Sequence, residues 1–269
     1  MRRFRSALIV GASGGLGRSL ACELAPVCES LILASRNLGR LSQLKAELEG
    51  RFPTCVVHVF SIDLEITSSV DEFLSRMRER PPVELLIMNA GYGTFKKFLD
   101  AEWSDHQATL LGNLLGTMKV VHSLLPGMGE RALALGYRAE LMLVSSHSSG
   151  MRIPHFSVYV PAKTFLTQWG RTLAMELKGK GIGVTIPCPG AMATEFSVRS
   201  GIPKMVSTPE PPERIAKECV RLIGRGGVHY LNWYDRFLQF ANWISPVFLM
   251  DAVVDRVQQK ALARISSKP

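Results

Sequence analysis

Cysteine is scarce in this 269-residue chain, and its five cysteines follow none of the spacings that bind metal or form a redox pair. They are Cys22, Cys28, Cys55, Cys188 and Cys219. No Cys-x-x-Cys pair occurs, and no histidine stands near them in a zinc-ligand pattern. We therefore expect no metal site and no disulfide framework, as in a reduced cytoplasmic protein.

The sequence also lacks low-complexity tracts, internal repeats and any linker-like segment that would divide it. Apolar residues make up 46% of the chain, which is enough for a sizeable core. We interpret residues 1–232 as one domain and residues 233–269 as a C-terminal helical extension of the same domain.

Long apolar runs are missing as well. The run at residues 7–10 is too short for the apolar region of a signal peptide and is better interpreted as a buried strand. The later apolar stretch between Phe237 and Met250 is broken by Pro246 and is too short to span a bilayer.

Basic residues outnumber acidic ones by 32 to 23, which gives a net charge of +9. This charge favours anionic ligands such as phosphates, or an anionic membrane surface. The basic residues are scattered and form no known nucleic-acid motif, so we expect no nucleic-acid partner.

Apolar runs and helical patterns alternate along the chain. Strands are expected at residues 7–10, 30–34, 55–60, 84–88, 140–145, 183–186 and 228–231, and helices at residues 18–25, 38–49, 68–80, 104–125, 157–178 and 211–223. Strands that alternate with helices imply a parallel sheet covered on both faces. We predict the α/β class, a single-domain, doubly wound sheet of about seven strands. The sixth strand should end before Pro187, because proline removes a ladder hydrogen bond from a central strand.

A glycine-rich turn lies between the first expected strand and helix, with glycines at Gly11, Gly15 and Gly17. The first glycine permits a tight turn, and the others let a pyrophosphate approach the free N–H groups of the helix N-terminus. This arrangement predicts a dinucleotide site of the Rossmann type.

The end of the second strand carries Ser35 and Arg36 where an NAD site usually has an acidic residue. A 2′-phosphate prefers a cation, and Arg36 with Ser13 offers a phosphate site. We favour NADP(H) as the cofactor; the alternative is that Arg36 is a solvated surface residue.

Tyr159 and Lys163 are four residues apart, and Ser146 precedes the tyrosine by thirteen residues. Positions i and i+4 share one face of a helix, so an ammonium placed there can stabilise a phenolate. A tyrosine whose pKa is brought toward neutrality can transfer a proton. Together with the glycine turn, these residues indicate redox chemistry between carbonyls and alcohols on a nicotinamide cofactor.

At this point the chain resembles the short-chain dehydrogenase/reductase family over residues 6–232. The resemblance rests on the glycine turn, Asp63-Leu64, Asn89-Ala90-Gly91, Asn113, Ser146, Tyr159-x-x-x-Lys163, and Pro189-Gly190 followed by Thr194. It departs from the family at Val160-Pro161-Ala162, where proline is tolerated only in the first turn of a helix.

The resemblance implies a role for each of these residues. Tyr159 would be the general acid for ketone reduction, and Lys163 would bind the nicotinamide ribose and lower the tyrosine pKa. Ser146 would polarise the substrate carbonyl, and Asn113 would hold a water in a proton relay. The implied cofactor-binding residues are Gly11, Ser13, Gly15, Leu16, Gly17, Arg36, Asp63, Leu64, Asn89, Ala90, Gly91, Tyr159, Lys163, Pro189, Gly190 and Thr194.

Several neighbours of the expected site have alternative interpretations. Ser145, Ser148 and Ser149 compete with Ser146 for the catalytic role, although the spacing to the tyrosine favours Ser146. His147 suggests a hydrolase, but no Gly-x-Ser-x-Gly elbow exists and we interpret it as a scaffold residue. The segment 151–156 either lines the substrate entrance or is a surface loop.

The C-terminal segment has two interpretations. Basic residues recur every fourth position in Arg256, Lys260, Arg264 and Lys268, and an apolar face is offered by Val254, Val257, Ala261 and Ile265. This segment either caps the substrate pocket and packs on a second subunit, or attaches the protein to an anionic membrane surface. We expect a cytoplasmic protein, with membrane association as the second option.

These inferences lead to one expected activity, the NADPH-dependent reduction of an apolar ketone, such as a 3-oxoacyl chain, a steroid-like ketone or a long-chain keto-lipid. A non-catalytic NADP(H)-binding sensor or scaffold on the same fold is the alternative. A small apolar carbonyl or alcohol is the expected substrate. We also expect a homodimer or homotetramer, formed through the helices that begin near Ser104 and Tyr159.

Overall fold

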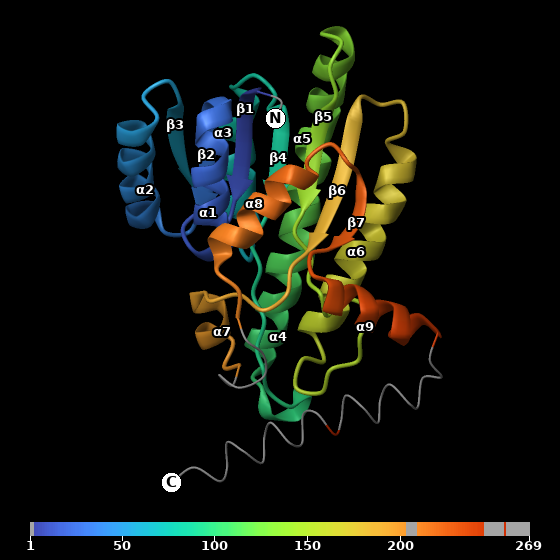
Figure 1. Cartoon of the computed structure of the whole chain (residues 1–269). Coiled ribbons are helices and arrows are strands. Elements are labelled where there is room, and N and C mark those ends of the chain that lie inside the picture. Colours follow the sequence, from blue (N-terminus) through green and yellow to red (C-terminus); the bar gives the residue numbers. More distant parts are fainter. Residues whose placement is uncertain (1–2, 203–208, 245–255, 257–269) are drawn as a thin grey trace.

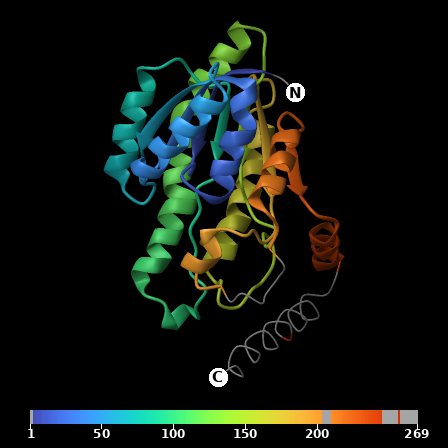
Figure 2. The ribbon, with the colours of Figure 1, turned by 60° about the vertical axis from the view of Figure 1, so that its left-hand side comes forward.

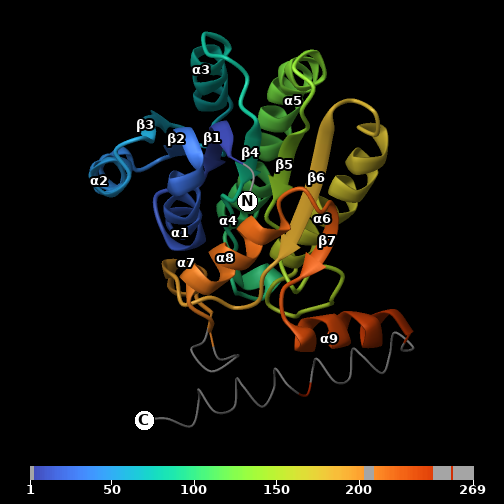
Figure 3. The ribbon, with the colours of Figure 1, turned by 45° about the horizontal axis from the view of Figure 1, so that its top comes forward.

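The structure, a computed structural model, describes residues 3–202, 209–244 and 256 (Figure 1). Seven parallel strands form one sheet in the order β3-β2-β1-β4-β5-β6-β7 (Figure 3). The strands are β1 (Phe4–Val10), β2 (Cys28–Ser35), β3 (Val56–Ser61), β4 (Leu85–Met88), β5 (Ala139–Leu143), β6 (Ile182–Cys188) and β7 (Gly227–Tyr230). The predicted α/β class and the seven-stranded parallel sheet are confirmed.

Helices cover both faces of this sheet. They are α1 (Gly15–Leu24), η1 (Ala25–Val27), α2 (Leu38–Arg51), α3 (Thr67–Arg78), η2 (Phe98–Asp100), α4 (Trp103–Leu110), η3 (Leu111–Leu115), α5 (Gly116–Ala134), α6 (Tyr159–Glu176), α7 (Glu195–Arg199), α8 (Pro212–Leu222) and α9 (Trp233–Ile244). Of the three short turns, η1 and η2 are 3-10 helical and η3 is π-helical.

The sheet separates two apolar layers, because successive side chains of a strand point to opposite faces. In β1, Leu8 and Val10 pack with α3, α5 and α6, whereas Ala7 and Ile9 pack with α1, α2 and α8. Both faces of the central strands are therefore buried, which explains why these strands read as continuous apolar runs.

Strand β6 differs from expectation at Pro187, which lies within the strand and is paired with His229 of β7. The carbonyl of Pro187 accepts a hydrogen bond from the Ser145 amide at 2.9 Å, so the missing N–H also faces the β5 side. Strand β5 ends at Leu143, before it reaches the level of the proline. The proline lies beyond the last register pair of β5 and β6, Met142 with Thr185, so its missing N–H removes no bond from the regular part of that ladder.

The fourth expected helix is longer than predicted and is not regular. Residues 103–134 form α4, the π-helical turn η3 and α5 in succession, instead of one helix over 104–125. Figures 1 and 2 show this stretch in green along one face, extending beyond the carboxyl ends of the strands. By contrast, α6 begins at Tyr159, so Pro161 falls in its first turn as the sequence requires.

Within residues 3–202, 209–244 and 256, no helix is long and apolar enough to cross a membrane. The apolar residues 247–250, the basic stripe from Lys260 to Lys268 and residues 203–208 lie outside the described residues.

Candidate active site

The glycine turn packs directly against the chain that follows β4. A Cβ added to Gly11 would lie 2.6 Å from the backbone nitrogen of Ala90, and one added to Gly17 would lie 2.0 Å from the Gly11 carbonyl oxygen. The Asn89 amide donates from Nδ2 to that same carbonyl at 2.9 Å. The two predicted motifs, the glycine turn and Asn89-Ala-Gly91, thus form one packed unit.

The N-terminus of α1 is left open for an anion. Its cap, Gly14, supplies no side-chain hydrogen bond, and the first turn contains no acidic residue. Gly15 adopts a positive φ of 51°, and the side chain of Thr194 lies 3.1 Å from where its Cβ would be. The predicted Thr194 is therefore brought next to the glycine turn, at the positive end of the helix dipole.

Arg36 stands at the end of β2 but is not a free cation. Its guanidinium lies 3.0 Å from Oε1 of Glu65 and 4.0 Å from Oδ2 of Asp63. Burial raises the pKa of Glu65, and the nearby Arg36 opposes this effect. The sequence showed no acid directly after β2, yet two carboxylates reach this point from the segment after β3. Glu65 was not predicted as a site residue.

A second arginine, Arg40, lies close to the glycine turn. One of its terminal nitrogens would be 3.7 Å from a Cβ at Gly14. The same nitrogen lies 2.8 Å from Oε2 of Glu195 on α7. Arg40 lies in the first turn of α2, and the sequence analysis did not use it as a candidate phosphate ligand.

Asn113 lies in the π-helical turn η3 and is fixed from both sides. It donates from Nδ2 to the carbonyls of Tyr92 and Thr109, at 2.6 and 2.7 Å. Its Oδ1 is buried and has no hydrogen-bond partner among the described residues. A Cβ at Gly91 would lie 3.2 Å from both this Oδ1 and Nζ of Lys163, so the two polar atoms face the same small space.

Lys163 is buried, and among the described residues its Nζ donates to the Val144 carbonyl at 3.0 Å. Burial lowers the pKa of this ammonium to about 8. Nζ lies 5.9 Å from the centroid of the Tyr159 ring, as expected for positions i and i+4 on α6.

Tyr159 lies half-buried at the start of α6. Burial raises its pKa above the ordinary value, and a hydrogen bond with Ser146 opposes that rise. The family resemblance implied a tyrosine pKa lowered by Lys163, whereas here desolvation of the phenol is the dominant effect. A Cβ at Gly93 would lie 2.5 Å from Cδ2 of the ring, so Gly93, which the sequence analysis missed, fixes the ring position.

The four neighbouring serines differ in what their hydroxyl groups contact. Ser145 Oγ lies 2.6 Å from the Thr167 hydroxyl, and Ser149 Oγ donates to the same hydroxyl at 2.9 Å. Both therefore anchor the loop to α6. Ser148 Oγ lies 2.9 Å from Ser146 Oγ, which leaves Ser146 as the hydroxyl that contacts the phenol.

Aromatic rings surround Tyr159 from three segments of the chain. Its centroid lies 5.1 Å from that of Phe156 and 5.4 Å from that of Phe196 on α7. Phe95 extends the cluster, with its centroid 4.9 Å from Phe156 and 5.1 Å from His155. His155 has a φ of 67°, the one positive value outside glycine among the described residues. Segment 151–156 thus reaches the tyrosine instead of forming a detached surface loop.

The remaining predicted residues also lie at this end of the sheet. Leu64 is buried, and its carbonyl oxygen would be 2.3 Å from a Cβ at Gly116. The carbonyl of Pro189 accepts from the His147 amide at 2.8 Å, and Gly190 lies against α9. Ser13 and Leu16 belong to the glycine turn and the first turn of α1.

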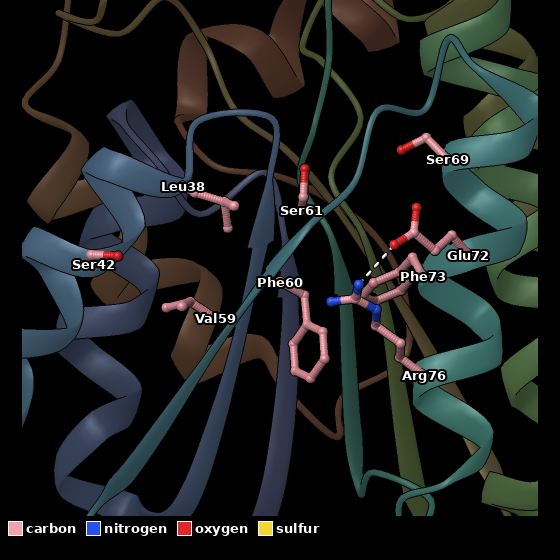
Figure 4. A pocket seen from close by; sticks show the side chains of 9 residues that line it. All are labelled: Leu38, Ser42, Val59, Phe60, Ser61, Ser69, Glu72, Phe73 and Arg76. Atoms are coloured by element: carbon pink, nitrogen blue, oxygen red, sulfur yellow. Dashed lines mark hydrogen bonds and ion pairs between the residues drawn. The ribbon is translucent and has the colours of Figure 1, made fainter.

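A separate cavity of about 330 Å³ lies at the free edge of β3, between α2 and α3 (Figure 4). Its lining comes from those three elements and includes the ion pair between Glu72 and Arg76 and the ring of Phe60. The predicted catalytic residues lie on other elements, so this cavity is not the space around Tyr159.

Comparison with known proteins identifies the family. The family model for short chain dehydrogenases matches residues 5–202. A sulfoacetaldehyde reductase of Chromohalobacter salexigens is 34% identical over 72% of this chain and 75% of its own length. A very-long-chain 3-oxoacyl-CoA reductase of Pyricularia oryzae is 29% identical, and the match spans 76% of this chain but only 61% of that protein.

Solved structures show the same fold. A short-chain dehydrogenase from Sphingobium yanoikuyae in complex with NADPH superposes with a TM-score of 0.79 at 21% identity, covering 98% of this chain and 96% of the other. A 7beta-hydroxysteroid dehydrogenase superposes with a TM-score of 0.77 at 18% identity, covering 94% and 96%. The chain therefore belongs to the short-chain dehydrogenase/reductase family of oxidoreductases, which act on carbonyl and alcohol groups.

Proposed function

We propose that this protein is an NADPH-dependent reductase of an apolar ketone, with Tyr159 as the general acid. The observation that carries the proposal is the cluster around the phenol: Ser146 hydrogen-bonds it, Lys163 lies one helical turn away, and three aromatic side chains pack near it. This cluster lies at the same end of the sheet as the open N-terminus of α1 (Figure 1).

The residues present fit a dinucleotide. Gly11 and Gly17 allow the close packing of the turn, and the free N–H groups of α1 suit a pyrophosphate. Arg36, with Ser13, would hold a 2′-phosphate after giving up its contact with Glu65. The NADPH and NADP complexes among the similar structures agree with this choice. In this proposal residues 1–232 carry the cofactor and the chemistry, and residues 233–269 extend the same domain.

The remaining cofactor contacts are those that the family resemblance implies. Asp63 and Leu64 would face the adenine, Asn89, Ala90 and Gly91 would support the cofactor at the sheet edge, and Thr194 would hold the carboxamide. The other residues proposed to line the cofactor site are Leu16, Pro189 and Gly190. When bound, NADPH supplies the hydride.

The protein's own part is to orient the carbonyl and deliver a proton. Ser146 polarises the carbonyl oxygen, and the Tyr159 phenol donates its proton to that oxygen. A raised pKa keeps the phenol protonated at neutral pH, as a general acid for reduction requires. Asn113 Oδ1 and Lys163 Nζ face one small space, which suits a bridging water that returns the proton to the tyrosine.

The apolar surroundings of Tyr159 favour an apolar substrate. Phe95, Phe156 and Phe196 would contact the chain or ring system attached to the carbonyl. Relatives act on substrates as different as sulfoacetaldehyde and very-long-chain 3-oxoacyl-CoA. The aromatic cluster supports the second kind, a long acyl or steroid-like ketone, over a small anion.

The first experiment follows the absorbance of reduced nicotinamide with NADPH and then NADH. The panel contains short and long 3-oxoacyl thioesters, steroid ketones, aryl ketones and sulfoacetaldehyde. We expect NADPH-selective turnover of the apolar ketones and a loss of about a hundredfold or more in kcat for Tyr159→Phe. NADPH binding without turnover of any ketone would favour the sensor alternative.

Two assembly features belong to the same proposal. We expect subunits to pair through the α4–α6 region, where Trp103, Leu115 and Phe165 are exposed.

The C-terminal segment would attach to anionic membrane, and flotation with anionic liposomes is the measurement. No co-migration, with unchanged behaviour after truncation at Ser245, would rule out that attachment.

A further inference from the structure

We propose that Asp235 and Gln239 of helix α9 are positioning residues for the reaction, because they clamp the Ser146–Ser149 loop to the Pro189–Gly190 segment. The inference rests on the proposed function and extends it to the C-terminal part of the chain. Helix α9 lies beyond the carboxyl ends of β6 and β7, beside the candidate site (Figures 1 and 3).

The first contact is an ion pair or hydrogen bond between Asp235 and the serine loop. Oδ1 of Asp235 lies 2.9 Å from Nδ1 of His147, the residue next to Ser146. The Asp235 side chain is only 5% exposed. Its backbone N–H donates to Oδ1 of Asn232 at 2.7 Å, which fixes the first turn of α9. The carboxylate itself bonds to His147 through Oδ1, while its Oδ2 is buried without a hydrogen-bond partner among the described residues, so moving the carboxylate would leave both oxygens unpaired.

The second contact comes from the next turn of the same face. Gln239 lies four residues after Asp235 and donates from Nε2 to the carbonyls of His147 and Ser149, each at 2.8 Å. These two carbonyls flank Ser148, whose hydroxyl contacts Ser146. One amide group therefore sets the path of the backbone on both sides of Ser148.

The third contact joins α9 to the segment after β6. A Cβ at Gly190 would lie 3.2 Å from Oδ2 of Asp235 and 3.3 Å from Nδ2 of Asn232. The His147 amide also donates to the Pro189 carbonyl at 2.8 Å. The start of α9 thus packs on both segments that the proposed function assigns to the substrate carbonyl and to the cofactor.

The consequence is geometric. Ser146 polarises a carbonyl only if its hydroxyl is held within hydrogen-bond distance, and small misplacements of a catalytic group lower the rate strongly. Loosening the Gln239 contacts should therefore lower kcat while leaving the affinity for NADPH unchanged, since both hydrogen bonds of this amide go to the serine loop and neither goes to the cofactor-binding segments.

The test compares Gln239→Ala, the near-isosteric Gln239→Glu and Asp235→Asn with a control, Arg236→Gln. Arg236 is exposed and its Nε donates to the Tyr230 carbonyl, away from the serine loop. We expect kcat to fall about tenfold in Gln239→Ala and at least as far in Gln239→Glu, because a carboxylate facing two carbonyls repels them. Asp235→Asn keeps a hydrogen bond to His147 and should retain more activity. The control should stay within about twofold of the native kcat.

Two further readouts separate positioning from general packing. Amide hydrogen exchange of residues 146–150 should rise in Gln239→Ala, and NADPH affinity and the melting temperature should stay near native. A Gln239→Glu variant with native kcat would overturn the proposal, since shape alone would then suffice. If Tyr159→Phe remains active, the proposed function fails; if that variant is inactive while the Gln239 variants are fully active, only the clamp fails.

Discussion

At the scale of single residues, the candidate site concentrates buried polar groups that a simple core would avoid. Lys163 has one carbonyl partner, Asn113 has a buried oxygen without a partner among the described residues, and Tyr159 has a raised pKa. Buried groups of this kind reduce stability and are kept where chemistry requires them.

Lys163 gives a stability prediction with a definite sign. Its pKa is about 8 in the fold and 10.5 in the unfolded chain, so the unfolded chain binds more protons between these values. Native stability should therefore rise with pH across that window. Lys163→Met should be more stable than the native protein by at most about 3 kcal/mol near neutral pH. Urea unfolding of both proteins should show this difference shrinking as the pH approaches 10.5; a difference that is constant with pH would contradict the assignment.

Glu65 gives a second prediction, because its carboxylate pairs with the Arg36 guanidinium that a 2′-phosphate would need. Glu65→Gln should lower the Kd for NADPH by up to about fivefold, the equivalent of the roughly 1 kcal/mol that an exposed ion pair contributes. Fluorescence titration measures the effect, and NADH affinity should not change. The matched control is Glu72→Gln, which breaks the pair with Arg76 on α3. Weaker NADPH binding in Glu65→Gln would show that the carboxylate supports the site.

The site residues that could be predicted from the sequence are those whose relative positions are determined by local helix and turn geometry. Tyr159 and Lys163 share a helix, and the glycine turn joins a strand to the next helix, so their relation follows from spacing alone. Glu65 meets Arg36 from 29 residues away, and Phe196 meets Tyr159 from 37, through irregular segments whose path no periodic pattern encodes. Gly93 was within reach, as a second glycine after Asn89-Ala-Gly91.

At the scale of elements, the sequence pattern predicted the type and order of the main strands and helices but not their irregularities. The π-helical turn η3 carries Asn113, and nothing in the apolar pattern of residues 104–125 distinguishes it from a regular helix. Pro187 falls inside β6, which runs on to Cys188 while β5 ends at Leu143; such differences in strand length are not encoded in the local sequence.

Helix α6 approaches the sheet closely at Gly170, and this contact can be tested. A Cβ there would lie 2.6 Å from Cδ1 of Ile186 and 3.0 Å from Cδ1 of Leu143. Gly170→Ala should lower the free energy of unfolding by about 1–2 kcal/mol, because overpacking exceeds the gain in helix propensity. Gly50→Ala on α2, where nothing lies within 4 Å, should raise it by about 1 kcal/mol instead. Urea unfolding of the two variants measures both changes in the free energy of unfolding. Equal changes would contradict the close approach of α6 to the sheet at Gly170.

At the scale of the whole molecule, apolar side chains remain exposed on the helices at one side. Trp103, Leu115 and Phe165 expose 66%, 60% and 44% of their surface, which is costly unless another subunit covers them. We expect a native homodimer or homotetramer, and a smaller species in the double variant Leu115→Glu, Phe165→Glu. Sedimentation velocity measures both. Val56→Glu, a change at an equally exposed position on the edge strand β3, should leave the mass unchanged. A monomeric native protein would contradict the expectation.

The order of the strands has a consequence for the chain during its synthesis. Strand β1 lies between β2 and β4, so one of its edges stays open until residues 85–88 have been made. From then on β5, β6 and β7 each add to the same growing edge in chain order. The early half of the chain can therefore fold progressively behind the ribosome, while α9 arrives after every strand is in place. If α9 clamps the serine loop as we propose, the protein can position a substrate carbonyl only after its whole sheet has formed.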